Sequence, residues 1–241
     1  MWGDRVIVER KEYLEKLIAW KDKKLIKIVT GVRRCGKSML LEIYQNYLKQ
    51  HNVEKEQIIA INFENLDYEE LTDYKKLYNY LKEHLVINKM TYIFLDEIQN
   101  VPDFPKVLDS LYIKNNVDIY VTGSNAYMLS SEIATMISGR YVQIEMLPLS
   151  FREYMESTGS MNDRGIKYAE YLQNSSFPYT LELKNQPNEI REYLEGIYNT
   201  IVVKDIVNRK KITDTMMLKS VLQFIFDNIG NPLSSKKLQI R

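Results

Sequence analysis

The sequence feature that most constrains the fold is the octapeptide at residues 31–38, which reads Gly-Val-Arg-Arg-Cys-Gly-Lys-Ser. It matches the pattern G-x-x-x-x-G-K-[ST] and stands between an apolar run with strand character and a run with helical spacing. In that context such a loop binds phosphate. Its glycines let the backbone turn N–H groups, and the N-terminus of the next helix, toward a polyphosphate. The pattern therefore predicts a nucleotide site rather than a fortuitous glycine-rich turn.

The residues of this loop predict how a nucleotide is held. Lys37 is expected to contact the β- and γ-phosphates, and the hydroxyl of Ser38 is expected to bind Mg²⁺, so the predicted ligand is ATP with Mg²⁺. The side chains of Arg33 and Arg34 are expected to point away from the phosphates, because such a loop binds through its backbone. The predicted contacts comprise Gly31, Val32, Arg33, Arg34, Cys35, Gly36, Lys37, Ser38 and Met39.

Cys35 is the single cysteine of the chain, which excludes an intramolecular disulfide. A thiol beside cations and at a helix N-terminus has a lowered pKa. The place of Cys35 in the loop therefore predicts a reactive thiol whose alkylation would block nucleotide entry. The two histidines, His51 and His84, stand in charged helical stretches with no motif relation to Cys35, so we expect structural roles for both.

A second motif, at residues 92–97, is a hydrophobic strand that ends in two acids, the pattern called Walker B. A buried parallel strand would bring Asp96 to the Mg²⁺ site beside Ser38. Glu97 can accept a proton from an attacking water, which is what nucleotide hydrolysis requires. The alternative for Glu97 is an acidic helix N-cap stabilised by the helix dipole. The presence of both motifs in one chain favours the hydrolytic role.

Two further segments supply candidates whose roles the sequence leaves open. Ser124 and Asn125 follow a strand-like run; if that strand lies between the other two, either side chain can reach the γ-phosphate as a sensor. Gly-Ser-Asn is equally typical of an ordinary turn. Arg140 stands before the fifth run, where an arginine can stabilise transition-state charge in its own chain or in a neighbour. A solvated arginine or a structural ion pair is the alternative.

Composition and charge exclude several classes of protein. The chain has 241 residues, with 33 Lys and Arg against 32 Asp and Glu, so its net charge of +1 gives no global field for nucleic acid. Its N-terminus is charged where a signal peptide would be apolar, and no stretch approaches the roughly 18 apolar residues of a membrane span. We therefore expect a soluble cytoplasmic protein with no membrane contact.

Short apolar runs alternate with helical patterns through residues 1–147. This alternation predicts an α/β domain with a parallel sheet of about five strands and helices on both faces. The expected strands are Leu25–Thr30, Ile58–Phe63, Thr91–Leu95, Asp118–Thr122 and Tyr141–Met146. Residues 148–241 lose the strand pattern and are expected to form a smaller, mainly helical segment, with helices over Leu149–Met155, Arg164–Asn174, Glu189–Val207 and Met216–Ile229.

The motifs together resemble a known family. Gly-Val-Arg-Arg-Cys-Gly-Lys-Ser, Phe-Leu-Asp-Glu-Ile-Gln, Thr-Gly-Ser-Asn, Ser-Gly-Arg-Tyr and Leu-Pro-Leu-Ser-Phe occur in this order. Their order and spacing resemble the AAA-type P-loop ATPases of bacteria and archaea whose ATPase core precedes a C-terminal domain of the DUF4143 type. The resemblance implies nucleotide and Mg²⁺ roles for Lys37, Ser38, Asp96 and Glu97, a sensor role for Ser124 or Asn125, and a candidate role for Arg140.

The resemblance also implies how the chain is divided. Residues 1–147 would form the AAA-type P-loop NTPase domain, and residues 148–241 would begin a DUF4143-like domain. Members of this family usually continue well past a motif like that at residues 230–234. We therefore expect the second domain to be incomplete in a chain that ends at Arg241.

The leading interpretation is Mg²⁺-dependent ATP binding and hydrolysis by a molecular switch coupled to a C-terminal effector segment. The candidate partners are a protein or a second copy of the chain; DNA is a candidate for a full-length relative and is disfavoured for this chain. The alternative is a nucleotide-dependent protein- or DNA-interaction module with negligible hydrolysis of its own. The effect of Glu97 on turnover separates the two. A small-molecule kinase is disfavoured by the presence of Glu97.

Overall fold

The structure is a computed structural model of the 241-residue chain, and it describes residues 6–124, 137, 139–159, 163–183, 186–201, 206–207 and 212–232. The chain divides into two compact units, of which the first runs to Ile190 and the second begins at Arg191. The first unit holds a parallel sheet and the helices that cover it. In the described residues of the second unit the regular elements are helical.

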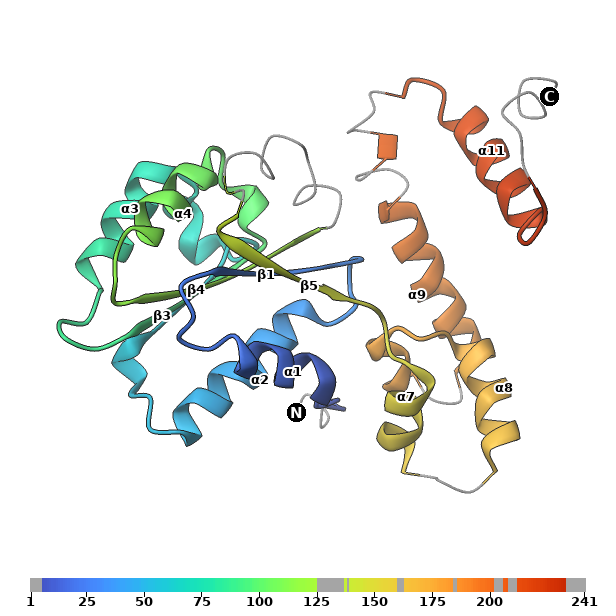
Figure 1. Ribbon diagram of the computed structural model, residues 1–241. Coiled ribbons are helices and arrows are strands. Elements are labelled where there is room, and N and C mark those ends of the chain that lie inside the picture. The colour runs from blue at the N-terminus through green and yellow to red at the C-terminus, as the bar shows by residue number, and fades with distance from the viewer. Residues whose placement is uncertain are drawn as a thin grey trace. The chain divides into compact units, whose positions relative to one another are not determined.

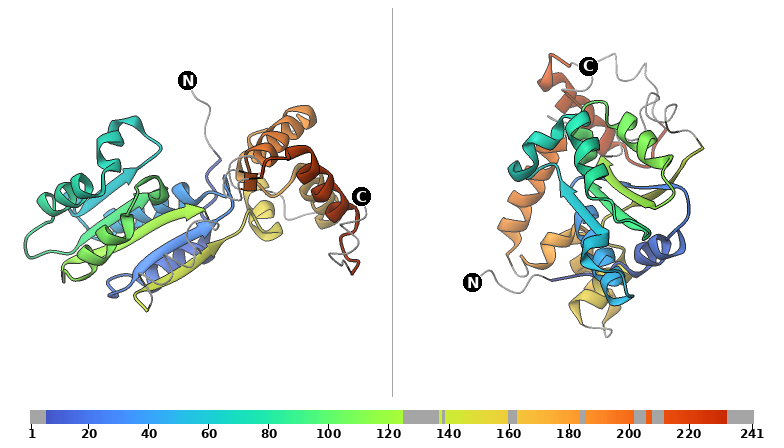
Figure 2. Two further views of the ribbon diagram at one scale, coloured as in Figure 1. Left: turned by 90° about the horizontal axis from the view of Figure 1, so that it is seen from above. Right: turned by 90° about the vertical axis from the view of Figure 1, so that its left-hand side faces the viewer.

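The sheet has five strands in the order β2-β3-β4-β1-β5, and every neighbouring pair is parallel. Figure 1 shows the strands from one side, and the left view of Figure 2 shows them lying side by side. This confirms the predicted α/β fold with its five-stranded parallel sheet. The strands are β1 (Ile26–Gly31), β2 (Ile58–Asn62), β3 (Thr91–Asp96), β4 (Val117–Ser124) and β5 (Tyr141–Met146).

Helices cover both faces of the sheet because alternate strand residues point to opposite sides. Ile28 of β1 packs in the core beneath α3 (Tyr74–Glu83) and α4 (Phe104–Tyr112). Its neighbour Val29 packs in the other core, beneath α1 (Lys11–Ala19) and α2 (Lys37–Gln50). Figure 1 shows the two helix layers on either side of the strands. Short 3-10 segments complete this region at Lys55–Gln57 (η1), Leu66–Thr72 (η2) and Ile98–Asn100 (η3).

In the described residues after β5 the regular elements are helical, as predicted. The helices are α7 (Phe151–Thr158), α8 (Arg164–Asn174), η4 (Pro178–Leu181), α9 (Pro187–Thr200) and α11 (Thr215–Asp227). Leu149, Tyr154 and Leu181 form a small core against which Val6 and Val8 pack. The first compact unit therefore extends well past residue 147, where the α/β pattern ends. Among the described residues, no helix has both the length and the apolar character that a membrane span requires.

A buried ion pair lies inside the sheet, where the sequence pattern suggested only apolar strands. Lys27 of β1 and Asp118 of β4 pair through Nζ and Oδ1, and both side chains are fully buried. The second carboxylate oxygen of Asp118 accepts hydrogen bonds from the Asp22 N–H at 2.8 Å and the Tyr120 hydroxyl at 2.9 Å. Nζ of Lys27 also donates to the Lys23 carbonyl oxygen at 2.7 Å. The network ties the turn before β1 to β4.

We expect Asp118→Asn to lower the free energy of unfolding by about 3–5 kcal/mol, because it leaves the Lys27 ammonium buried without its counter-charge. Urea denaturation followed by circular dichroism measures the loss. The matched control is Glu70→Gln, which removes an exposed pair with Lys76 and should leave stability nearly unchanged. Equal stability of the two variants would show that the buried pair contributes no more than a surface one.

Candidate functional site

The loop at residues 31–38 joins the end of β1 to the start of α2, and its two glycines are required for different reasons. A Cβ atom on Gly31 would overlap the carbonyl oxygen of Met146 and would lie 2.8 Å from the sulfur of Cys35. Gly36 precedes the first residue of α2 and has φ 101°, in the left-handed region that favours glycine. The chain can therefore make this tight connection only with glycine at both ends of the loop.

Lys37 folds back over this loop. Its ammonium nitrogen lies 3.4 Å from the carbonyl oxygen of Gly31 and 3.3 Å from that of Val32, and 3.7 Å from Oε1 of Glu97. The side chain is almost completely buried. A cation in this place is available to a polyphosphate that the loop encloses, because neighbouring carbonyl oxygens hold it by contacts that an anion can replace.

Asp96 ends β3, and the side chains around it come from two other elements. Its carboxylate accepts hydrogen bonds from the hydroxyl of Thr122 on β4 and from the side chain of Ser38 on α2. Burial raises the pKa of Asp96 above its usual range, and these two hydrogen bonds oppose that rise. The sheet thus brings together Ser38 and Asp96, the two residues predicted as Mg²⁺ ligands, whose hydroxyl and carboxylate oxygens are the donor atoms that Mg²⁺ prefers.

Glu97 has an unusual backbone conformation, with φ 54° and ψ 45°. Non-glycine residues rarely adopt this left-handed region, and such residues concentrate at functional sites. The N–H of Glu97 donates to the Thr122 hydroxyl at 2.9 Å, and its carboxylate meets Lys37 and accepts a hydrogen bond from Gln99. Glu97 is the N-cap residue of η3, and its side chain makes no capping hydrogen bond there.

Two residues of this site escaped the sequence analysis. The hydroxyl of Thr122 bonds to both Asp96 and the backbone N–H of Glu97, and Thr122 lies two residues before the end of β4, beside Val29 of β1. Gln99 holds the Glu97 carboxylate, and its own Oε1 is buried with no hydrogen-bond partner in the part of the chain that the structure describes. A polar residue directly after the apolar run at residues 119–121 was the available signal for Thr122.

The structure places the remaining candidates, Ser124 and Arg140, at opposite ends of the strands. Ser124 is the last residue of β4 and stands beside Gly31 in the strand register, at the same edge of the sheet as the loop. Asn125 lies outside the described residues. Arg140 is at the opposite edge, because its carbonyl oxygen accepts the N–H of Ile26, the first residue of β1. Its guanidinium pairs with Asp109 of α4 at 2.7 Å. Arg140 therefore cannot reach a phosphate on its own chain's loop.

Cys35 does not have the reactive thiol that the sequence predicted. The side chain is fully buried in the core beneath α1 and α2. Burial raises its pKa, and the nearby cations Lys37 and Arg10 only partly oppose this. The prediction considered the charge of the loop and overlooked the direction of the side chain. Of the remaining loop residues, Val32 and Arg34 are exposed, whereas Arg33 and Met39 are half-buried.

Comparisons with known proteins bear on the family and the fold. A family model described as an AAA domain matches residues 23–155, more than half of the chain. An uncharacterized protein of Haemophilus influenzae is 37% identical over 240 residues, covering 97% of this chain and 59% of the relative. The uncharacterized protein MJ1544 of Methanocaldococcus jannaschii is 31% identical over 232 residues, covering 88% of this chain and 49% of the relative. The chain thus spans about half to three fifths of these relatives' lengths.

A solved structure shares the fold. It is described as the Walker-type ATPase paby2304 of Pyrococcus abyssi, and it matches with a TM-score of 0.55 at 14% sequence identity. The match covers 99% of this chain and 90% of the other. At this identity the likeness concerns the arrangement of helices and strands.

The burial of Cys35 gives a prediction that reverses the one made from sequence. In the folded protein we expect alkylation of Cys35 by iodoacetamide at pH 7.5 to be at least tenfold slower than in the chain unfolded in urea, since both burial and the raised pKa disfavour the reactive thiolate. Mass spectrometry of timed samples measures the rates. Labelling of the folded chain at the unfolded rate would mean that the thiol faces solvent.

Proposed function

This chain belongs to the AAA domain family, and we propose from this premise that it binds ATP with Mg²⁺ at the loop of residues 31–38 and hydrolyses it. The observation that carries the proposal is the meeting of Lys37, Asp96 and Glu97 at the carboxyl edge of the sheet. These side chains come from two elements that are distant in sequence, and the glycine-bounded loop lies beside them.

The loop supplies phosphate binding. Its backbone N–H groups and the N-terminus of α2 attract negative charge. Lys37 adds a full positive charge. Its ammonium group would move away from the carbonyl oxygens of Gly31 and Val32 and contact the β- and γ-phosphates instead. Arg33 and Arg34 contribute through their backbone in this proposal. Ser124, next to Gly31 in the strand register, is the proposed sensor of the γ-phosphate together with Asn125.

Ser38 and Asp96 would hold Mg²⁺. A bound Mg²⁺ would neutralise phosphate charge and orient the β- and γ-phosphate oxygens. Asp96 suits this task because its carboxylate is already fixed by Thr122 and Ser38, and a nearby dication would counter the burial that raises its pKa. The protein's part is to keep these oxygens in one place at the end of β3.

Glu97 is the proposed general base for the attacking water. Its carboxylate lies 3.7 Å from the Lys37 ammonium, and Gln99 donates to its other oxygen. Transfer of Lys37 to phosphate would release one oxygen of Glu97, which could then accept a proton from water. In this proposal, binding of the nucleotide prepares the base, and Glu97, with its left-handed backbone, keeps the hydrogen bond that Gln99 of η3 donates to its other carboxylate oxygen.

A second function follows from the same contacts. As the structure stands, Lys37 and Gln99 both engage the Glu97 carboxylate. If nucleotide binding leaves these contacts intact, the protein is a nucleotide-dependent interaction module for protein or DNA with negligible hydrolysis. Turnover by the purified chain distinguishes this module from the ATPase.

We propose that the helices from α7 onward begin a DUF4143-type effector domain, as the sequence resemblance implies. The partner that senses the nucleotide state would then be a protein or a second copy of the chain. Arg140 could act on a nucleotide only in a second copy, because its own loop is at the other edge of the sheet. DNA binding is proposed for longer relatives rather than for these 241 residues.

We expect Glu97→Gln to retain ATP binding and to lower turnover at least about 100-fold, because an amide keeps the shape of the side chain but cannot take the proton. Phosphate release from Mg·ATP measures turnover, and titration of a fluorescent ATP analogue measures binding. The control is Glu83→Gln, an exposed acid on α3. Unchanged turnover would assign the base elsewhere, and no turnover in the wild type would favour the interaction module.

We expect Lys37→Ala to weaken ATP binding about 10- to 100-fold, because it removes charge-assisted hydrogen bonds to phosphate worth roughly 1.5–3 kcal/mol. Isothermal titration calorimetry measures the affinity. Lys49→Ala removes an exposed lysine from the last turn of the same helix and should leave the affinity unchanged. Wild-type affinity in Lys37→Ala would place the nucleotide site somewhere other than the loop.

A further inference from the structure

We propose that Arg10 positions the phosphate-binding loop from behind and that its ion pair with Glu153 couples the loop to α7. This inference rests on the proposed nucleotide binding at residues 31–38. It assigns a role to the segment before α1, which none of the motifs includes. The coupling would allow the helical part of the first unit to influence how tightly the loop holds phosphate.

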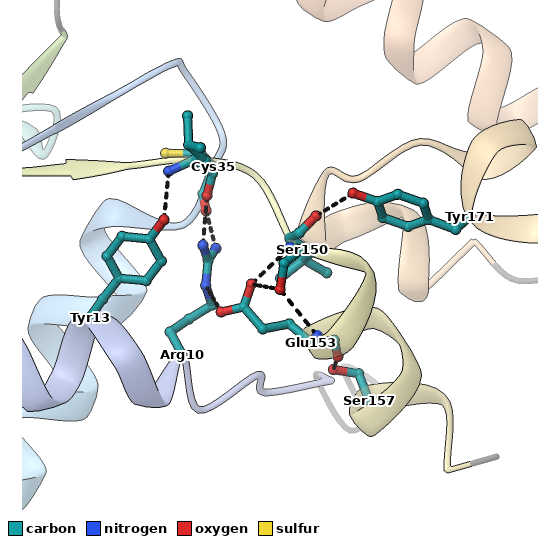
Figure 3. A network of polar contacts seen from close by, with 9 residues as sticks. Arg10, Tyr13, Cys35, Ser150, Glu153, Ser157 and Tyr171 are labelled. Atoms are coloured by element: carbon teal, nitrogen blue, oxygen red, sulfur yellow. Dashed lines mark hydrogen bonds and ion pairs between the residues drawn. The ribbon is translucent and has the colours of Figure 1, made fainter. Parts of the chain in front are cut away.

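Arg10 joins three parts of the chain that are distant in sequence. Nη1 donates to the carbonyl oxygen of Cys35 at 3.0 Å, and Nη2 donates to that of Leu147 at 2.6 Å. Nε pairs with Oε1 of Glu153 at 2.8 Å. Figure 3 shows the guanidinium between the loop and α7, with the ring of Tyr13 beside it. The guanidinium carbon lies 4.8 Å from that ring's centroid, and only 3% of Arg10 is exposed.

The backbone of Arg10 is also held in a special conformation. It has φ 51° and ψ 48°, in the left-handed region, and it directly precedes α1 without a side-chain cap on that helix. A non-glycine residue in this region costs free energy that the surrounding structure must offset. The guanidinium contacts with Cys35, Leu147 and Glu153 are the interactions that can offset it. The Arg10 side chain therefore contacts the loop and does not cap α1.

The contact with Cys35 acts on the part of the loop that faces phosphate. The carbonyl of Cys35 and the N–H of Gly36 belong to one planar peptide unit and point in opposite directions. When the loop aims the Gly36 N–H at a phosphate, the Cys35 carbonyl must point into the protein, where it needs a donor. Arg10 is that donor, and a charge-assisted bond to the carbonyl also polarises the N–H on the other side.

Glu153 links this contact to α7. Its Oε1 holds Arg10, while its Oε2 accepts from the N–H of Ser150 at 2.8 Å and from the Ser150 hydroxyl at 3.0 Å. These last contacts belong to the capping box that starts α7. One carboxylate thus fixes both the start of the helix and the guanidinium behind the loop. A shift of α7 must move Arg10 or break the ion pair.

The test compares nucleotide affinity in Arg10→Lys and Glu153→Gln. Lysine keeps the charge but has no fork that can bind Cys35, Leu147 and Glu153 together, so we expect about tenfold weaker binding of a fluorescent ATP analogue. Glu153→Gln should weaken binding about threefold, because the amide still accepts from Ser150. Both are measured well below each variant's melting temperature. The matched controls are Arg152→Lys and Glu156→Gln, an exposed pair on the same helix, which should bind as the wild type does.

Hydrogen exchange supplies a readout that a purely structural role would not move. Coupling is reciprocal, so bound nucleotide should slow exchange in residues 151–158 of the wild type and of the control variants, but not in Arg10→Lys. If Arg10→Lys does not fold, the same two measurements are made on Glu153→Gln. Wild-type nucleotide affinity and wild-type protection of residues 151–158 in that variant would overturn the inference. A folded Arg10 variant with wild-type affinity and wild-type protection of α7 overturns this inference alone. A wild type that does not bind the analogue overturns the proposed function and this inference with it.

Discussion

The parallel direction of the sheet is the constraint on which the site depends. In parallel strands every carboxyl end lies at the same edge, so the loop after β1, Asp96 at the end of β3 and Thr122 on β4 must meet there. The strand order adds a second condition, because β4 lies between the strands that carry the two motifs. Thr122 can therefore bind Asp96 and the backbone of Glu97 at once. The site's geometry is a consequence of topology more than of any local segment.

Charge in this edge of the sheet is balanced among buried groups. Lys37 lies between the carbonyl oxygens of the loop and the carboxylate of Glu97, and Asp96 depends on hydroxyl donors because burial disfavours its ionised form. A buried charge is stable only when it is paired or hydrogen-bonded. A polyphosphate with its cation would add charges of both signs at the same place. The arrangement is therefore suited to a ligand that exchanges partners with these side chains rather than filling an apolar pocket.

The sequence predicted the sheet and the two motifs because both are encoded locally. A strand is visible as a short apolar run, and the strands lie within a residue or two of the expected bounds. Side-chain direction and long-range pairing are not encoded in this way. The loop sequence places Cys35 among cations, but only the fold turns its thiol into the core. Arg140 stands just before a strand, and its distance from the loop follows from the parallel pairing of β5 with β1. Gln99 and Thr122 act through contacts that no pattern of spacing reveals.

Two buried cations, Lys27 and Arg10, make similar contacts but have different roles. Lys27 pairs with Asp118 inside the strands, and every donor and acceptor around it belongs to fixed elements, so this network can only stabilise. Arg10 is bound instead to the loop that we propose binds phosphate through its backbone, and to a carboxylate that also accepts the capping hydrogen bonds at the start of α7. Its partners lie 25, 137 and 143 residues away along the chain. An arginine fork suits three such acceptors because its five N–H donors point in different fixed directions in one plane. In our proposal the geometry of the phosphate-binding loop thus depends on Arg10, which itself contacts no phosphate, and Glu153 joins Arg10 directly to α7.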